Sequence, residues 1–530
     1  MKAFFKIFFA SFLAMLIFSI LAVVAGLVIL GAALQPSKPS IGSKALLVLD
    51  LSTAYPEQAK ENPLSSFTGK TNYNTPGLYD IVRMIAHAKT DSTIKGIYIQ
   101  CGSNGNGFAA SEELRDALSD FRQSRKFVLA YGEAIDQKSY YVATAADKIY
   151  CHPQGGVDWN GFSATLTFMK GLLDKLEIQP QIFYAGKYKS ATEPLRVTKM
   201  SDPNRAQTSE LLGDLYNQFL TAASAARNID TATLRSLSVN GSIQTANDAL
   251  KYGLVDGLKY DDEMKSIIQQ MIGLKEKDKI NFVSMSTYAE AVHFKSNGDG
   301  KIALIYASGD IVDGKSQDET ITSEEFTEMI RKARLDDNVK AIVFRVNSPG
   351  GSSLASDAIW REITLAKETK PVVVSMGNYA ASGGYYIACN ADSIFADRGT
   401  VTGSIGVFSV IPNLQPFFNN KLGITFDGVK TAPYADMGSV SRPLSETEKK
   451  FFQSSVDSIY STFKQRVADG REKDIVYIDS IAQGHVYTGT RGLQLGLTDK
   501  IGGLQQAVEC AARMAGGKNF YTAEYPEKKG

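Results

Sequence analysis

An internal repeat constrains what this chain of 530 residues folds into more than any other feature of its sequence. Residues 80–149 align with residues 325–394 at a constant offset of 245 positions and without a gap. The identical pairs include Ala88 and Ala333, Gly132 and Gly377, Tyr140 and Tyr385, and Asp147 and Asp392. Chance similarity does not hold one offset over such a length, and self-similarity of this kind marks copies of one structural unit. The chain is therefore expected to contain two copies of one domain.

The repeat also sets the predicted domain boundaries. We predict a first repeat at residues 42–275 and a second at 300–525. A linker at 276–299 joins them, and the polar stretch 295–300 marks the junction. Residues 1–41 precede both repeats as a short cytoplasmic stub, an apolar segment and a short connection.

Each repeat alternates apolar runs with stretches of helical spacing. In the second repeat, residues 340–346, 372–374 and 391–395 have the composition of buried strands, and residues 356–367 have the period of a helix. Continuous apolar strands separated by helices are typical of an α/β fold with a mostly parallel sheet. Ligands of such sheets bind at the carboxyl ends of the strands.

The N-terminal segment has the properties of a membrane anchor. Lys2 and Lys6 precede an uncharged run from Ile7 to Leu34, which at ~1.5 Å per residue is long enough to cross a hydrocarbon core of about 30 Å. The small residues 31–33 also resemble a signal-peptide cleavage site, but the apolar part of such a peptide spans only about 7–15 residues. We therefore expect one uncleaved transmembrane helix, a cytoplasmic N-terminus and a body outside the cytoplasm.

Composition excludes several classes of function. Lysine and arginine number 57 against 56 aspartates and glutamates, so no basic excess points to nucleic acid. The four cysteines show no CxxC spacing, which argues against a disulfide scaffold and against a cysteine metal site. Cys101 and Cys389 fall in apolar contexts and are expected to be packed thiols. We expect neither a metal nor a cofactor.

The run GNYAASGGYYIA at 377–388 places Ser382 between a predicted strand and the predicted first turns of a helix at 385–389. A serine at such a turn can attack a carbonyl carbon, and the amide of Gly383 can bind the oxyanion that develops. The same residues also fit an ordinary turn that only starts a helix.

A second glycine pair follows the preceding strand, in the run NSPGG at 347–351. Glycines at 350 and 351 let the backbone approach a ligand closely, and Gly351 can supply a second oxyanion amide or an edge that pairs with a peptide. The pair also fits a common Pro-Gly turn. Val346, Met376 and Tyr379 are near enough in sequence to be candidate walls of a substrate pocket.

A nucleophilic serine needs a base, and the sequence offers several. Of the four histidines, His485 is the best candidate, although none lies in a polar motif shared by the repeats. A lysine can replace histidine when burial or nearby positive charge lowers its pKa. Lys189 and Lys187 follow a strand-like run among small and apolar residues, and Lys430 is the rival within the second repeat.

Four motifs together resemble the long form of the signal peptide peptidase A family, also called protease IV. They are GNYAASGGYYIA, VNSPGG, TVTGSIGVF at 400–408 and AGKYKSATEP at 185–194, and the resemblance covers essentially the whole chain. It implies a ClpP/crotonase-like fold and a Ser/Lys-dyad serine protease. The family's nucleophile falls on Ser382, its general base on Lys189, and its lysine-positioning serine on Ser404.

The resemblance also implies a setting for the enzyme. Members of the long form are single-pass proteins of the bacterial inner membrane whose body faces the extracytoplasmic, periplasmic side. They assemble as bowl-like homotetramers and digest apolar peptides, with cleaved signal peptides as the expected substrates.

The repeat tests this assignment independently. At the offset of 245, Ser382 corresponds to Gln137, so the first repeat lacks the nucleophile. Lys189 corresponds to Ala435 or Asp436, so the second repeat lacks that lysine. Because each repeat keeps one half of a dyad, the site is expected to form between the two. A crotonase-like acyl-CoA enzyme and a catalytically inactive membrane scaffold are the rival functions.

Overall fold

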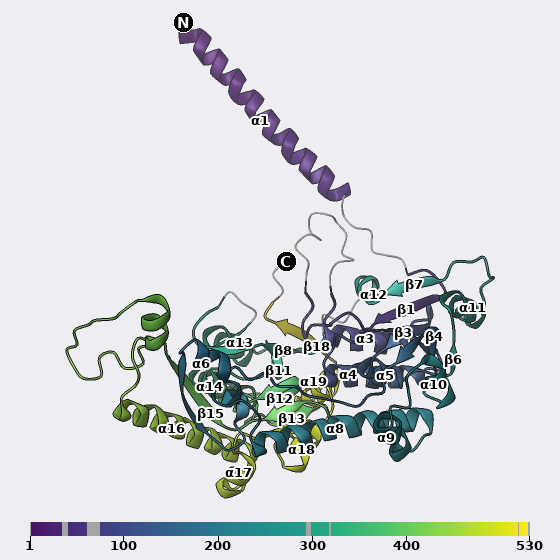
Figure 1. The fold of residues 1–530 in the computed structure, drawn as a ribbon. Coiled ribbons are helices and arrows are strands. Elements are labelled where there is room, and N and C mark those ends of the chain that lie inside the picture. The colour runs from purple at the N-terminus through teal and green to yellow at the C-terminus, as the bar shows by residue number, and fades with distance from the viewer. Residues whose placement is uncertain are drawn as a thin grey trace.

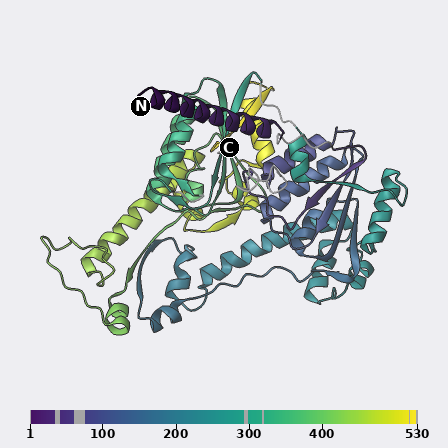
Figure 2. The same ribbon diagram turned by 90° about the horizontal axis from the view of Figure 1, so that it is seen from above.

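The computed structural model describes residues 2–33, 41–60, 75–292, 298–316, 320–517 and 519–527. Its body contains two sheets side by side, one from each half of the chain (Figure 1). Seen from above, the blue-to-teal body of the first half and the green-to-yellow second half lie next to each other (Figure 2). Helix α1 (Lys2–Ala33) extends away from this body as a rod.

The first sheet has six strands in the order β6–β4–β3–β2–β1–β7, and all neighbours pair in parallel. The strands are β1 (Ala45–Asp50), β2 (Ile94–Cys101), β3 (Phe127–Ile135), β4 (Lys148–Val157), β6 (Gly257–Leu258) and β7 (Asn281–Ser284). The helices of this half are α3 (Leu78–Ala88), α4 (Phe108–Arg122), α5 (Gln137–Ala143), α6 (Lys170–Lys175), α7 (Glu193–Arg196), α8 (Asp202–Arg227), α9 (Thr231–Val239), α10 (Ala246–Lys251), α11 (Asp261–Ile272) and α12 (Met285–Ala291), with the 3₁₀ turn η2 (Ser190–Thr192).

The second sheet contains the order β17–β13–β12–β11–β8–β18, again with parallel pairs. Strand β14 adds to the far end of β12 in parallel, and β16 pairs with β14 antiparallel. The strands are β8 (Gly300–Ser308), β11 (Val339–Ser348), β12 (Val372–Ala381), β13 (Ser393–Ala396), β14 (Val401–Gly403), β16 (Val486–Thr488), β17 (Lys500–Ile501) and β18 (Phe520–Tyr525); β9 (Ile311–Val312) and β10 (Ile321–Thr322) form a separate pair. The helices are α13 (Ser323–Leu335), α14 (Ser353–Lys367), α15 (Gly383–Tyr386), η3 (Phe417–Leu422), α16 (Glu446–Arg471), α17 (Ile475–Ile481), α18 (Gly489–Gln494) and α19 (Leu504–Met514).

The shared strand order confirms the α/β fold class and the tandem repeat. Each strand of the first sheet has its counterpart at the same place in the second, from β6 and β17 at one end to β7 and β18 at the other. The helices agree as well, because α8 and α16 both have 26 residues and both begin after a serine N-cap, Ser201 and Ser445. Each of these hydroxyls accepts a hydrogen bond from the third helical amide, which satisfies a donor that the helix leaves unpaired.

The segment predicted as a linker contains regular structure. Strand β7 lies within residues 276–299 and pairs with β1, and helix α12 follows it directly. Val283 and Tyr288 from these elements are buried in the core of the first half. Residues 293–297, which include His293 and the first half of the predicted junction, lie outside the described residues.

Alternate side chains of the second sheet face two different layers of helices. Ala303 and Ile305 of β8 belong to one apolar cluster with residues of α13 and α14, whereas Ile302 and Leu304 pack with Leu504 of α19. A parallel sheet that is covered on both faces needs apolar residues at successive positions. This explains why its strands are continuous apolar runs.

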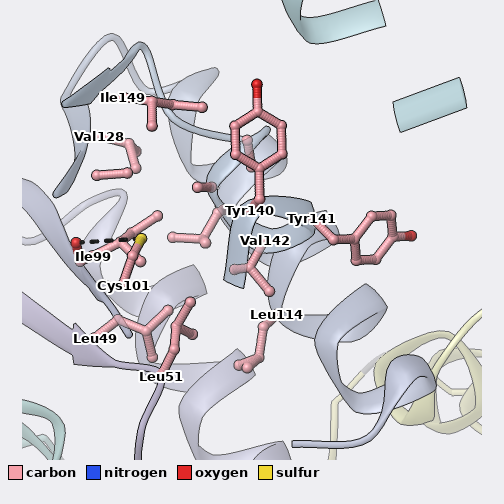
Figure 3. Packing of buried hydrophobic residues seen from close by; sticks show 14 of the residues in the cluster. Leu49, Leu51, Ile99, Cys101, Leu114, Val128, Tyr140, Tyr141, Val142 and Ile149 are labelled. Atoms are coloured by element: carbon pink, nitrogen blue, oxygen red, sulfur yellow. Dashed lines mark hydrogen bonds between the residues drawn. The ribbon is translucent and has the colours of Figure 1, made fainter. Parts of the chain in front are cut away.

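The core of the first half is built from the same positions. Leu49, Ile99 and Val128 of three neighbouring strands pack with Leu114 of α4 and with Tyr140 of α5 (Figure 3). Cys101 lies in this cluster, and all four cysteines of the chain are buried free thiols. The prediction that Cys101 and Cys389 are packed thiols is confirmed.

A two-stranded ribbon connects the halves. Strand β5 (Gln179–Ala185) comes from the first half, yet it pairs antiparallel with β15 (Val407–Asn413) of the second. Phe183 and Ala185 of β5 belong to the apolar core of the second half. The segment that follows β5 therefore lies against the second sheet rather than the first.

A buried ion-pair cluster joins the halves elsewhere. Arg345 of β11 is fully buried, and its guanidinium donates to Glu57 Oε2 at 2.8 Å and to Glu113 Oε1 at 2.5 Å, both from the first half. It also donates to Ser375 Oγ at 2.8 Å within its own sheet. Because one arginine bonds both halves in a water-free position, the relative placement of the two repeats is specified by side-chain chemistry as well as by apolar packing.

Helix α1 is long and apolar enough to cross a membrane by its length and composition, over Phe4–Val23. Every described side chain from Phe4 to Val23 is exposed, so this stretch contributes nothing to the described core. An apolar helix without a protein partner needs a non-aqueous surrounding.

Candidate active site

Ser382 lies where strand β12 ends and the one-turn helix α15 begins. Its backbone has φ 54° and ψ −121°, a conformation that is uncommon for a residue with a side chain. The Ser382 amide donates to the Gly403 carbonyl at 2.9 Å, which helps to hold this turn. A helix follows Ser382 as predicted, but α15 spans Gly383–Tyr386, so it begins two residues before the turns predicted at 385–389 and ends after a single turn. Strained backbone of this kind persists only where the surroundings fix it, and it is concentrated at functional sites.

Lys189 is brought to Ser382 by the ribbon that joins the repeats. It follows β5 directly after the turn at Gly186, and its side chain is buried. The Lys189 Nζ atom lies 2.9 Å from Ser382 Oγ. It also lies 3.0 Å from both the carbonyl oxygen and the Oγ of Ser404. The three residues on which the resemblance placed the dyad and its positioning serine therefore meet at one point.

Burial determines the protonation of this lysine. It lowers the pKa of the Lys189 ammonium from 10.5 to about 7. Among the described residues, no carboxylate forms an ion pair with Lys189 to restore the charged form. A lysine with this pKa is partly neutral at physiological pH, which a proton acceptor requires.

Ser404 lies at the end of β14 and is fixed by its backbone. It has a positive φ of 52°, and its amide donates to the His485 carbonyl at 2.7 Å. This places both its hydroxyl and its carbonyl oxygen toward the amine of Lys189.

The loop at 483–485 packs against the backbone of residues 188–189. The sequence did not predict this contact. The Tyr188 amide donates to the Gln483 carbonyl at 2.8 Å. A methyl group on Gly484 would lie 2.7 Å from the amide nitrogen of Lys189. Gly484 has no counterpart in any of the motifs that pointed to the site, so no sequence signal identified it.

The two glycine motifs lie against each other at the serine. A methyl group on Gly350 would come within 2.7 Å of the Gly383 amide nitrogen and 2.9 Å of Ser382 Cβ. A methyl group on Gly383 would lie 3.1 Å from the amide nitrogen of Gly351. Within the described part of the chain, neither the Gly351 amide nor the Gly383 amide donates to another protein group. Two unpaired amides thus lie close together beside Ser382.

The other candidate bases have different partners. The Lys430 amine pairs with Asp436 at 2.7 Å, and the exposed Lys187 lies over the ring of Tyr188. The His485 ring bonds through Nδ1 to the Val486 carbonyl at 2.8 Å, and burial lowers its pKa. Among the described residues, no three histidine, cysteine, aspartate or glutamate side chains form a group that could hold a metal ion.

The predicted pocket walls are only partly supported. Val346 and Met376 are fully buried in the core of the second half, so they do not line a substrate pocket. Tyr379 is 52% exposed, three residues before Ser382. The difference follows the position along β12, because residues on both faces of the strand are buried from Val372 to Gly377 and exposure begins only at Asn378 and Tyr379.

Comparison with known proteins gives the family of this chain. The model of the family "Peptidase family S49" matches twice, at residues 120–275 and 364–518. The chain is 36% identical to Protease 4 of Salmonella typhi over 502 residues, which cover 92% of this chain and 81% of that protein. It is 34% identical to Protease 4 of Haemophilus influenzae, covering 86% and 75%. It is also 32% identical to the chloroplastic serine protease SPPA of Arabidopsis thaliana, covering 81% and 64%.

Among solved structures, a ClpP1 variant from Listeria monocytogenes aligns with 39% of this chain and 94% of its own at 13% identity and a TM-score of 0.26. A variant of the 1510-N membrane-bound stomatin-specific protease aligns with 43% and 99% at 16% identity and a TM-score of 0.29. The two family matches and the long relatives favour a peptidase over the acyl-CoA enzyme and the scaffold that the sequence left open. The chain belongs to peptidase family S49 and is a serine peptidase.

Proposed function

We propose that this peptidase uses a Ser/Lys dyad, with Ser382 as the nucleophile from the second repeat and Lys189 as the general base from the first. The observation that carries the proposal is the 2.9 Å separation of Lys189 Nζ and Ser382 Oγ, at a buried lysine without an ion-pair partner among the described residues.

The hydrogen-bond count supports a neutral lysine in this role. A neutral amine has two N–H donors and one lone pair. Ser404 offers two acceptors, its carbonyl oxygen and its Oγ, each 3.0 Å from Lys189 Nζ. Once both N–H groups donate to Ser404, the lone pair is left for the hydroxyl proton of Ser382.

The reaction then follows from the positions of these groups. Ser382 Oγ attacks the carbonyl carbon of the scissile bond while Lys189 takes its proton. The amides of Gly383 and Gly351 donate to the oxyanion. Lys189 returns the proton to the leaving amine as the C–N bond breaks, which leaves an acyl-enzyme. Water attacks the ester, Lys189 accepts a proton from that water, and Ser382 regains its proton as the acid product departs.

As substrates we propose apolar peptides, in particular cleaved signal peptides. The exposed ring of Tyr379 near the nucleophile supports an apolar binding surface, as does Leu354, which is 73% exposed three residues after Gly351. Burial of apolar side chains on such surfaces contributes roughly 25 cal/mol per Å².

We further propose that α1 anchors the enzyme in the bacterial inner membrane as a single pass, with the body on the extracytoplasmic side. The apolar span Phe4–Val23 and the lysines at positions 2 and 6 support this orientation. The test adds a protease to the outside of intact spheroplasts, where it is expected to digest the body of the enzyme. Digestion only after the spheroplasts are lysed would contradict the orientation.

A homotetramer is the proposed assembly. The end of η3 and the segment that follows it extend from the body (Figure 1). Four of their apolar side chains are exposed. These are Leu422, Ile424, Phe426 and Val429, which are 52%, 45%, 50% and 102% exposed. Apolar groups of this size are normally covered by a partner. Analytical ultracentrifugation of the anchor-free protein is expected to give four copies, and a monomer would contradict the assembly.

The experiment that tests the dyad is hydrolysis of an apolar fluorogenic peptide by the anchor-free protein. Ser382→Ala and Lys189→Met are each expected to lower kcat by about 10⁴-fold or more, because removal of a nucleophile or its base leaves only the binding and oxyanion contributions. Thermal unfolding of each variant shows whether it is folded.

Lys187→Met and Lys430→Met are the matched controls, since both remove a lysine that the sequence left open as the base. Both are expected to keep the wild-type kcat. If Lys189→Met stays active while Ser382→Ala is inactive, the base lies elsewhere and the site between the repeats is wrong.

A further inference from the structure

Gln207 in the first turns of α8 is a buried side chain whose polar atoms all face the loops around the dyad. It is 3% exposed. Its Nε2 donates to the Tyr188 carbonyl at 3.0 Å and to Ser190 Oγ at 2.8 Å. Its Oε1 accepts a hydrogen bond from the Val486 amide at 3.3 Å. Tyr188 and Ser190 are the two residues that flank Lys189.

These contacts close a ring of hydrogen bonds. The amine of Lys189 donates to Ser404, and the Ser404 amide donates to the His485 carbonyl at 2.7 Å. Val486, the next residue, donates to Gln207. Gln207 in turn donates to both neighbours of Lys189. One glutamine therefore fixes the distance between the loop of the first repeat that contains Lys189 and strand β16 of the second repeat. The residue before β16, His485, bonds the backbone of Ser404.

The partners also define which end of the amide faces which group. The Tyr188 carbonyl can only accept, so it needs an N–H donor, whereas the Val486 amide can only donate, so it needs an oxygen. A glutamate has two acceptor oxygens and cannot satisfy the Tyr188 carbonyl. A methionine of similar length satisfies none of the three partners.

We infer that Gln207 is a positioning residue for catalysis, which holds Lys189 at hydrogen-bonding distance from Ser382 across the boundary between the repeats. The inference rests on the proposed dyad. A small displacement of a catalytic group is enough to lower a rate by about 100-fold, because proton transfer depends on heavy-atom geometry.

The test compares Gln207→Met and Gln207→Glu with the wild type in kcat, KM and the pH dependence of kcat/KM for an apolar fluorogenic peptide. Gln207→Met is expected to lower kcat by about 10- to 100-fold with KM changed less than about threefold. In both variants the acid limb of the profile is expected to move to higher pH. In the methionine variant the loosened loop admits water to the amine, and in the glutamate variant the added charge favours the ammonium.

Gln269→Met is the matched control. Gln269 lies in α11 of the same repeat, and its Nε2 donates to the carbonyls of Glu276 and Asp278, both at 2.9 Å, so it also fixes a loop through backbone contacts. This variant is expected to keep the wild-type kcat and the wild-type acid limb. It separates the loss of a side-chain contact to a loop from the loss of lysine positioning.

The inference is overturned if both Gln207 variants keep the wild-type acid limb, whether their activity is full or reduced, because a purely structural glutamine leaves the limb in place. If Gln207→Met does not fold, the near-isosteric glutamate variant decides the question through its kcat on the alkaline plateau, because its added charge moves the acid limb by itself. A plateau kcat equal to that of the wild type overturns the inference. Lys189→Met is measured in parallel. An active Lys189→Met protein overturns both the dyad and this inference. If Lys189→Met is inactive and the Gln207 variants keep the wild-type kcat and acid limb, only the role of Gln207 is overturned.

Discussion

The proposed role of Lys189 as the base predicts that the activity of this peptidase depends on pH, in a direction that burial of the amine determines. Burial lowers the pKa of the ammonium to about 7, and only the neutral amine accepts a proton. We therefore predict that kcat/KM rises about tenfold per pH unit below this pKa and levels off above it. A peptide substrate without titrating groups measured from pH 5 to 9 checks this. A midpoint near 10.5, or a flat profile, would show that Lys189 is not the base.

The same residue links stability to pH. The pKa of Lys189 is lower in the folded protein than its ordinary value of 10.5, so the folded state binds fewer protons between pH 7 and 10.5. The contribution of this group to the free energy of unfolding is complete above pH 10.5, decreases as the pH falls below that value, and is fully lost once the pH has fallen through about 7. Lys189→Met removes the free-energy cost of burying the ammonium charge. We therefore expect this inactive variant to fold.

At the scale of elements, the loop after β11 and the turn after β12 form one unit. Gly350 has a φ of +109°, and a methyl group there would meet the Gly383 amide and Ser382 Cβ. Gly350→Ala is predicted to push these two segments apart and to lower kcat by about 100- to 1000-fold, as expected when an oxyanion donor is displaced.

Gly516→Ala controls for backbone strain in this comparison. Gly516 also has a positive φ, of +77°, but a methyl group there meets no atom within 4 Å. Measurements of kcat and of thermal unfolding for both variants separate displacement of the oxyanion donor from backbone strain at a glycine with positive φ. An active Gly350→Ala protein would mean that the glycine motif does not support the oxyanion site.

At the scale of the whole molecule, the dyad depends on how the two repeats sit against each other. Arg345 is the buried link, since it bonds Glu57 and Glu113 of the first repeat from a strand of the second. Arg345→Met leaves two buried carboxylates without their partner and is predicted to lower the free energy of unfolding by about 3–5 kcal/mol. Because the two residues of the proposed dyad come from different repeats, the peptidase activity of Arg345→Met is expected to fall under milder denaturing conditions than that of the wild type.

Arg334→Met provides the comparison for the loss of an arginine within one repeat. The Arg334 guanidinium pairs with Glu362 at 2.9 Å between α13 and α14, nearer to solvent. Its loss is expected to cost about 1 kcal/mol or less. Urea unfolding of both variants gives the two free energies, and equal values would show that the cluster at Arg345 does not stabilise the contact between the repeats.

Much of this architecture could be predicted because it depends on local patterns in the sequence. The fixed offset between two halves predicted two copies, and apolar runs predicted parallel strands buried on both faces. Motifs placed a serine at a strand-to-helix turn and a glycine pair one strand earlier, and the structure brings them together at the ends of β11 and β12. Neighbouring parallel strands end at the same edge, so sequence order alone brings these motifs close.

Sequence alone did not decide which lysine meets the serine. Lys187 and Lys189 are two residues apart, and only the tertiary structure buries one and exposes the other. The burial comes from segments far apart in the chain, because β5 crosses to the second half and the loop at 483–485 closes behind Lys189. A pKa set by desolvation depends on that packing rather than on neighbours in sequence. The repeat, the fold class and the chemistry of the motifs thus follow from the sequence, whereas the shared site follows from how the two copies pack.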